Sequence, residues 1–167
     1  MEHLWSPWRL AYVTGAAGTE RNDACIFCDT SEDREPLIVG RGRLAFVMLN
    51  KYPYNNGHLM VAPYRHVATL GATSEAERSE LMHLTRHAEM ALTEAYAPHG
   101  LNVGINLGRT AGAGIVDHVH VHLVPRWNGD TSFISVVGNT RVLPEALDDT
   151  AKRLRPIFAR LAVGAND

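Results

Sequence analysis

The segment 118–122 reads His-Val-His-Val-His, and this alternation constrains the fold more than any other feature of the chain. Side chains along a β-strand alternate between the two faces of a sheet, so a strand here would present three imidazoles on one face and valines on the other. Burying a polar ring without a hydrogen-bonding partner is costly, so a fold does not align three of them without a use. The uses that suit imidazole are metal ligation, nucleophilic catalysis and phosphate binding.

Length and charge bound the fold and its partners. The chain has 167 residues, of which 46% are hydrophobic, enough for one globular domain with a buried core. The formal net charge of −2 provides no broad basic surface, so we expect no nucleic-acid partner and only local binding of an anionic substrate. Apolar runs are far shorter than the roughly 20 residues of a membrane helix, and the N-terminus lacks a signal-peptide pattern. We therefore expect no membrane association and a cytoplasmic location.

Strand-like and helix-like segments follow one another in an order that predicts an α+β fold with a mostly antiparallel sheet. The clearest helical pattern covers 74–97, where Ser74 and Glu77 fit a capping box, and a second helix is expected from Pro144 to about Leu161. The expected strands are Leu37–Val39, Leu44–Leu49, His58–Ala62, Leu101–Leu107, Val116–Val124 and, shorter, Phe133–Val137. We expect a single domain over 1–167, with an N-terminal arm (1–24), a core that carries the motifs (25–130) and a C-terminal strand and helix (131–167).

Cys25 and Cys28 are the two cysteines of the chain, and in a reducing compartment their Cys-x-x-Cys spacing indicates half a zinc site or a redox pair before a structural disulfide. His66 and His118 are the candidates for two further ligands. A closed Cys₂His₂ tetrahedron would be structural, because no position is left for a water molecule, and the other two triplet histidines would be available for other chemistry. Two reduced core thiols are the simpler alternative.

A neutral imidazole is a competent nucleophile towards phosphorus at about pH 7 when one ring nitrogen is free and the other is tied to an acceptor. His120, at the centre of the triplet, suits this role, and His122 could bond a phosphate oxygen or the leaving group. The turn Gly112-Ala113-Gly114 just upstream offers backbone N–H groups to a phosphate. Two other classes stay open: a zinc hydrolase that uses all three histidines as ligands, and a nucleotide-binding interaction protein with little turnover.

Residues 118–124 fit the motif His-φ-His-φ-His-φ-φ at every position, and the chain resembles the histidine-triad (HIT) family. The resemblance extends over roughly residues 25–130 and is closest to the bacterial diadenosine tetraphosphate phosphorylase branch. It also rests on Cys25-Ile-Phe-Cys28, Leu49-Asn50, Gly57–Pro63, Asn106, the N-terminal Leu4-Trp5-Ser6-Pro7-Trp8-Arg9, the loop Asn50–Asn55 and the segment Val124–Asp130.

The resemblance implies a five-stranded antiparallel sheet, usually paired in a homodimer, and a reaction in which a nucleotide α-phosphate passes to the middle histidine and then to water or phosphate. The implied catalytic residues are His120 as nucleophile and His122 at the phosphates, with His118 completing the triplet. The implied nucleotide contacts are Asn50 at the ribose, Asn106, Gly112, Ala113 and Gly114 at the phosphates, and His58 as a buttress. In zinc-bearing members the ligands fall, in this chain, on Cys25, Cys28, His66 and His118.

Two positions bear on the substrate. Many family members carry Ala-Gly-Gln and then Ser or Thr before the triplet, whereas this chain has Ala-Gly-Ala-Gly-Ile at 111–115. Backbone donors must therefore replace a missing side chain near the scissile phosphate, or the leaving group must differ. The related uridylyltransferases have Gln where this chain has His122, which argues against a sugar-1-phosphate acceptor. The expected substrate is a dinucleoside polyphosphate such as diadenosine tetraphosphate, with a nucleoside phosphoramidate or a mononucleotide as the alternative.

Overall fold

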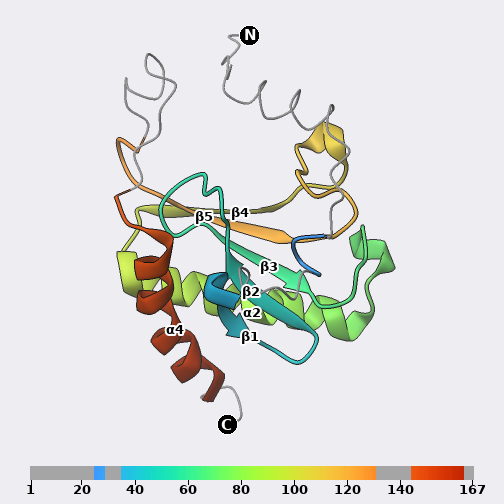
Figure 1. The fold of residues 1–167 in the computed structure, drawn as a ribbon, viewed down its shortest axis with the longest axis horizontal. Helices are drawn as coiled ribbons and strands as arrows, with labels where there is room; N and C mark the ends of the chain where they lie inside the picture. Colours follow the sequence, from blue (N-terminus) through green and yellow to red (C-terminus); the bar gives the residue numbers. More distant parts are fainter. Residues whose placement is uncertain (1–24, 29–34, 131–143, 164–167) are drawn as a thin grey trace.

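An antiparallel sheet of five strands organises the molecule (Figure 1). The computed structural model describes residues 25–28, 35–130 and 144–163. The strands lie in the order β1-β2-β3-β5-β4, and neighbouring strands are antiparallel throughout. Their bounds are Ile38–Arg41 (β1), Ala45–Leu49 (β2), Leu59–Pro63 (β3), Gly100–Ile105 (β4) and Val121–Arg126 (β5). The predicted α+β class and five-stranded antiparallel sheet are confirmed.

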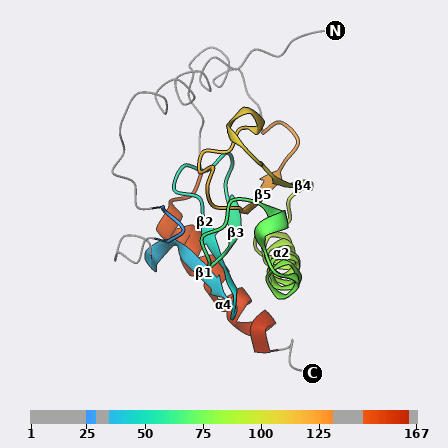
Figure 2. The ribbon, with the colours of Figure 1, turned by 90° about the vertical axis from the view of Figure 1, so that its right-hand side faces the viewer.

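Two helices pack against this sheet. Helix α2 spans Glu75–Tyr96 and lies along the middle strands, and α4 spans Leu147–Val163 and lies along β1 (Figure 2). Three short 3₁₀ segments connect the elements: Glu35–Leu37 (η1), Leu70–Ala72 (η2) and Arg109–Ala111 (η3). None of the described helices is long and apolar enough to cross a bilayer. The cytoplasmic location stays a prediction.

Helix α2 begins and ends where the sequence pattern indicates. The Ser74 hydroxyl accepts a hydrogen bond from the Glu77 backbone N–H, and the Glu77 carboxylate accepts one from the Ser74 N–H, which completes the predicted capping box. The helix closes at Ala97, whose positive φ of 43° turns the chain towards Pro98. The second helix begins at Leu147, three residues after Pro144. The predicted strand Phe133–Val137 lies outside the described residues.

The alternation of side chains separates a helix-covered face of the sheet from a second face. Helix-side residues of the strands form one core cluster with α2 and α4, and they include Val47, Leu49, Leu59, Val61, Val121 and Leu123. Intervening residues form a second cluster, which Phe27 joins from outside the sheet: Ile38, Phe46, Met48, Met60 and Ala62. His122 belongs to this second face, because it pairs with Met60 on β3 and Gly104 on β4. The triplet therefore lies away from the helices.

The strand that carries the triplet is shorter than predicted. It begins at Val121 and not at Val116, so His118 and His120 precede it and only His122 lies within it. Both neighbouring ladders end at Val121, which pairs with Val61 on β3 and Ile105 on β4. Near that end of β3, the Pro63 carbonyl is within 2.9 Å of the His118 ring nitrogen Nε2. The hydrogen bond between the His118 side chain and the Pro63 carbonyl therefore links the two segments beyond the last paired residues of β3 and β5.

Candidate active site and metal centre

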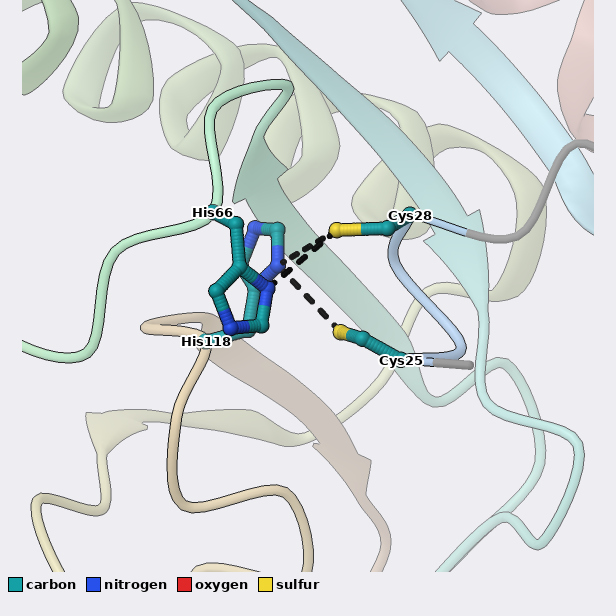
Figure 3. Close-up of side chains that lie close together, drawn as sticks. All are labelled: Cys25, Cys28, His66 and His118. Atoms are coloured by element: carbon teal, nitrogen blue, oxygen red, sulfur yellow. Dashed lines mark hydrogen bonds between the residues drawn. The ribbon is translucent and has the colours of Figure 1, made fainter. Parts of the chain in front are cut away.

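Four predicted metal ligands come together beside the sheet (Figure 3). Cys25 and Cys28 lie in one tight turn, closed by a hydrogen bond from the Cys28 N–H to the Cys25 carbonyl of 2.8 Å. The Cys28 sulfur is 3.3 Å from Nδ1 of His66 and 3.5 Å from Nδ1 of His118, and the Cys25 sulfur is 3.4 Å from the same His118 nitrogen. The four donor atoms all lie within 4.8 Å of one another.

These distances have the dimensions of a four-coordinate metal site. With metal–sulfur bonds of about 2.3 Å and metal–nitrogen bonds of about 2.0 Å, the sulfur–nitrogen edge of a tetrahedron is about 3.5 Å. The measured separations of 3.3 to 3.5 Å match that edge. The Pro63 carbonyl accepts a hydrogen bond from Nε2 of His118, so the lone pair of that ring is on Nδ1 and faces the sulfurs. Two thiolates and two neutral imidazoles suit a borderline-soft divalent cation.

A main-chain carbonyl also fixes the protonation of His120. Its Nδ1 is 2.8 Å from the carbonyl oxygen of His118, which can only accept, so Nδ1 carries the proton and Nε2 carries a lone pair. The ring is buried, with 3% of its surface exposed, and burial lowers the pKa of His120. A neutral ring with a free Nε2 is the form in which imidazole attacks an electrophile.

A relay of two hydrogen bonds fixes the tautomer of His122. The Tyr54 backbone N–H, which can only donate, lies 3.0 Å from Nδ1 of His58. Nδ1 of His58 therefore accepts and its Nε2 carries the proton, which is donated over 3.0 Å to Nδ1 of His122. The proton of a neutral His122 must then be on Nε2. Two adjacent rings of the triplet, whose centroids are 4.6 Å apart, thus carry opposite tautomers: one presents a lone pair at Nε2 and the other presents an N–H.

Burial keeps the His58 and His122 rings neutral. Desolvation, with a smaller effect of the neighbouring His122 and His120 imidazoles, lowers the pKa of His58 to about 3. Desolvation, then the His120 imidazole, lowers the pKa of His122 to about 4. Neither ring is cationic at neutral pH, so the relay of neutral tautomers holds there.

Two of the predicted nucleotide-binding residues, Asn50 and Asn106, make side-chain hydrogen bonds. Asn50 follows β2, its amide nitrogen lies 3.3 Å from Nδ1 of His58, and its side-chain oxygen accepts a hydrogen bond of 2.9 Å from the Tyr52 N–H. Asn106 donates a long hydrogen bond of 3.5 Å to the carbonyl of Gly112 and so helps to hold the glycine turn.

Backbone donors of the glycine turn are partly used within it. The N–H of Gly112 donates to Arg109 and that of Ala113 donates to Gly108, at 3.0 and 3.3 Å. Gly112 has φ of 92°, a left-handed conformation that disfavours a residue with a Cβ. Among the described residues, Gly114 is the member of the predicted trio whose N–H has no protein acceptor.

Two aromatic residues at the site were not predicted. Phe27 packs between the metal ligands and His120, with ring centroids 4.7 Å apart. The Tyr54 ring lies against His58 and His122, with centroids at 4.6 and 5.8 Å. The position of Phe27 between the two cysteines was the available signal for the first, and nothing in the spacing indicated the second.

Comparisons with known proteins agree with these observations. The HIT domain family model matches residues 32–129. The chain is 41% identical to an AP-4-A phosphorylase of Mycobacterium tuberculosis H37Rv, over 96% of this chain and 86% of that protein. It is 31% identical to the adenosine 5'-monophosphoramidase hnt1 of Schizosaccharomyces pombe, over 63% of this chain and 76% of that protein. A zinc-bound histidine triad family protein of Mycobacterium smegmatis superposes with a TM-score of 0.67 at 27% identity, covering 84% of this chain and 97% of that one.

The lowered pKa values of His58 and His122 predict a stability that falls on acidification. Both folded pKa values lie below the ordinary value of 6.5, so between about pH 6.5 and 4 the unfolded chain binds more protons than the folded chain. The free energy of unfolding then decreases as pH falls, by up to about 1.4 kcal/mol per pH unit for each ring. Urea unfolding at a series of pH values measures this slope.

His58→Asn removes one of these rings and should make the slope shallower. Thr93→Asn, at an exposed position with no titratable group, is the control and should leave the slope of the parent chain unchanged. An identical slope in the parent and His58→Asn chains would contradict the assignment.

Proposed function

The chain belongs to the HIT family and is an enzyme of the HIT type, and on this premise we propose that it transfers a nucleotidyl group through a covalent bond to His120. The proposed substrate is a dinucleoside polyphosphate such as diadenosine tetraphosphate. The observation that carries the proposal is the pair of opposite tautomers on adjacent rings, with a lone pair on His120 Nε2 and a proton on His122 Nε2. The likeness to an AP-4-A phosphorylase over 96% of this chain supports the choice of substrate.

The two tautomers suit the two halves of such a reaction. In the first half, Nε2 of His120 forms a bond to the α-phosphorus while the bond to the bridging oxygen of the leaving nucleotide breaks. His122 donates a hydrogen bond from its Nε2–H to that oxygen, and the nucleotide leaves as a polyphosphate anion. The adduct leaves positive charge on the His120 ring, which its Nδ1–H shares with the His118 carbonyl.

In the second half the acceptor, inorganic phosphate or water, attacks the phosphorus as the bond to His120 breaks. The His120 ring returns to its neutral form, and any proton that the acceptor loses passes to the solvent. The Gly114 N–H is a candidate donor to the phosphate oxygens. The proposed contacts of Asn50 with the ribose and of Asn106 with the phosphates rest on the family resemblance. The likeness to a phosphorylase favours phosphate as the acceptor, and hydrolysis of a phosphoramidate is the second candidate because of the likeness to hnt1.

We further propose that the ligand set of Cys25, Cys28, His66 and His118 holds a structural Zn²⁺ ion. Support comes from the tetrahedral spacing of the donors and from the zinc-bound relative. Four protein ligands leave no open coordination position, so a bound ion would act on the fold and not on water. The binding free energy of such a site contributes to folding.

A homodimer is proposed through strand β4. The other edge strand, β1, is covered by α4, and Arg155 of that helix donates a hydrogen bond to the Ile38 carbonyl. Strand β4 lies at the opposite edge, and its Val103 is 51% exposed. An edge strand that no other described element covers, and that carries an exposed apolar residue, favours pairing with a second copy.

Replacing the nucleophile should abolish turnover without unfolding the chain. We expect His120→Asn to lower cleavage of diadenosine tetraphosphate by roughly 10³-fold or more, and His122→Asn by roughly 10²- to 10³-fold through loss of the hydrogen-bond donor. Chromatography of the products with and without inorganic phosphate separates the acceptors: ADP with ATP indicates phosphorolysis, and AMP with ATP indicates hydrolysis. Mass spectrometry of quenched parent enzyme should detect the nucleotidyl adduct. A fully active His120→Asn chain would refute the proposed function.

Replacing a metal ligand should have a different effect. Cys25→Ser is expected to lower the zinc content measured by atomic emission and to lower the thermal midpoint, because the metal then no longer stabilises the folded state. His120→Asn is the control and should retain its zinc. A Cys25→Ser chain as stable and as zinc-loaded as the parent would exclude these ligands.

Charging the β4 edge should separate the copies. Val103→Glu is expected to lower the mass measured by light scattering from twice the 18.4 kDa chain to that of one chain, whereas Val103→Thr should leave the mass unchanged. A parent chain that is already monomeric at micromolar concentration would contradict the proposed dimer.

A further inference from the structure

Phe27 joins the metal-binding turn to the catalytic rings. It lies between the two cysteine ligands in the sequence, and its side chain is 1% exposed. Its ring centroid is 5.0 Å from that of His118 and 4.7 Å from that of His120. The turn that holds two of the metal ligands therefore also places an aromatic ring directly against the proposed nucleophile.

We propose that Phe27 is a positioning residue for the reaction, which transmits the geometry of the Cys25–Cys28 turn to His120 and holds its ring in the orientation for attack. The proposal rests on the function proposed above, because it assigns to His120 the attacking atom. It gives the metal centre a role in turnover in addition to its role in folding.

Each side of the His120 ring has an identified neighbour. Its Nδ1 is held by the His118 carbonyl, and His122 approaches with an interplanar angle of 75°. The hydrogen bond at Nδ1 fixes one atom of the ring and still allows the ring to rotate about that contact. The Phe27 ring lies 4.7 Å from the His120 ring, between centroids, at an interplanar angle of 36°, which is close enough to limit that rotation. Small displacements of a reacting atom lower the rate by large factors, so limiting the rotation of the His120 ring raises the rate of attack.

The position of Phe27 depends on the turn that carries it. Its ring belongs to the apolar cluster on the second face of the sheet, where the centroid of Phe46 is 6.5 Å away. The same ring contacts the rings of His118 and His120. The flanking Cys25 and Cys28 sulfurs face His118 and His66. A change in the spacing of the metal ligands would therefore move Phe27 against His120.

His118 provides a second connection between the same two places. Its Nδ1 faces the cysteine sulfurs, and its backbone carbonyl accepts the hydrogen bond from His120. The metal centre thus holds the nucleophile through the main chain on one side and through an aromatic ring on the other. The alternative is that Phe27 is only a core residue, and a second phenylalanine of the same cluster distinguishes the two.

The test compares Phe27→Leu with Phe46→Leu. Phe46 is 0% exposed and belongs to the same apolar cluster, and its ring stacks on Tyr64 at 5.2 Å. Both variants lose the same atoms from the same core, so both should lose stability. Only Phe27→Leu should lower kcat for diadenosine tetraphosphate, by about tenfold or more with KM changed less than about twofold, at rates normalised to the zinc-loaded fraction.

A readout independent of turnover is the ¹⁵N spectrum of the imidazoles in the zinc-loaded protein. In the parent and in Phe46→Leu, His120 should give one sharp Nδ1–H tautomer, and in Phe27→Leu this signal should broaden or split. Unchanged kcat and an unchanged His120 signal in Phe27→Leu would overturn the proposal, as would equal losses of kcat in the two variants. Failure of the proposed function is distinguishable, because it would appear as an active His120→Asn chain.

Discussion

Hydrogen bonds from main-chain atoms to buried imidazoles are the interaction on which the site depends. A carbonyl can only accept and an N–H can only donate, so each such contact fixes which nitrogen of a neutral ring carries the proton. The Pro63 carbonyl fixes the tautomer of His118, and the His118 carbonyl fixes that of His120. The Tyr54 N–H fixes the tautomer of His58, which in turn fixes that of His122. Because burial disfavours the charged form of His120 and of His122, their tautomers persist at neutral pH.

The sheet makes this arrangement possible by separating two tasks. Its helix-covered face carries the larger core, with Leu59 and Leu123 among its members, and anchors the strands. Its second face brings together β3, β5 and the turn of residues 25–28. The histidines can therefore be buried without competing for the space that α2 and α4 fill, and the metal ligands can approach from outside the sheet.

The sequence was sufficient for features that depend on local pattern or on a conserved spacing of ligands. The capping box at Ser74, the helix that follows it and the antiparallel sheet came from periodicity, and the grouping of Cys25 with His66 and His118 came from the family resemblance. Features set by long-range contacts were missed. Strand β5 begins at Val121 because its two partners stop pairing there, and no residue within 116–120 signals that. The contact of Phe27 with His120 joins residues far apart in the chain, and the one local signal for it was the position of Phe27 between the two cysteines.

The relay from His58 to His122 begins at the backbone N–H of residue 54, and this determines which substitutions the site can tolerate. Any residue other than proline supplies the same N–H at that position, so a change of side chain there leaves the proton on the same nitrogen of His122. The main chain of this loop, and not the Tyr54 ring, determines which nitrogen of His122 donates.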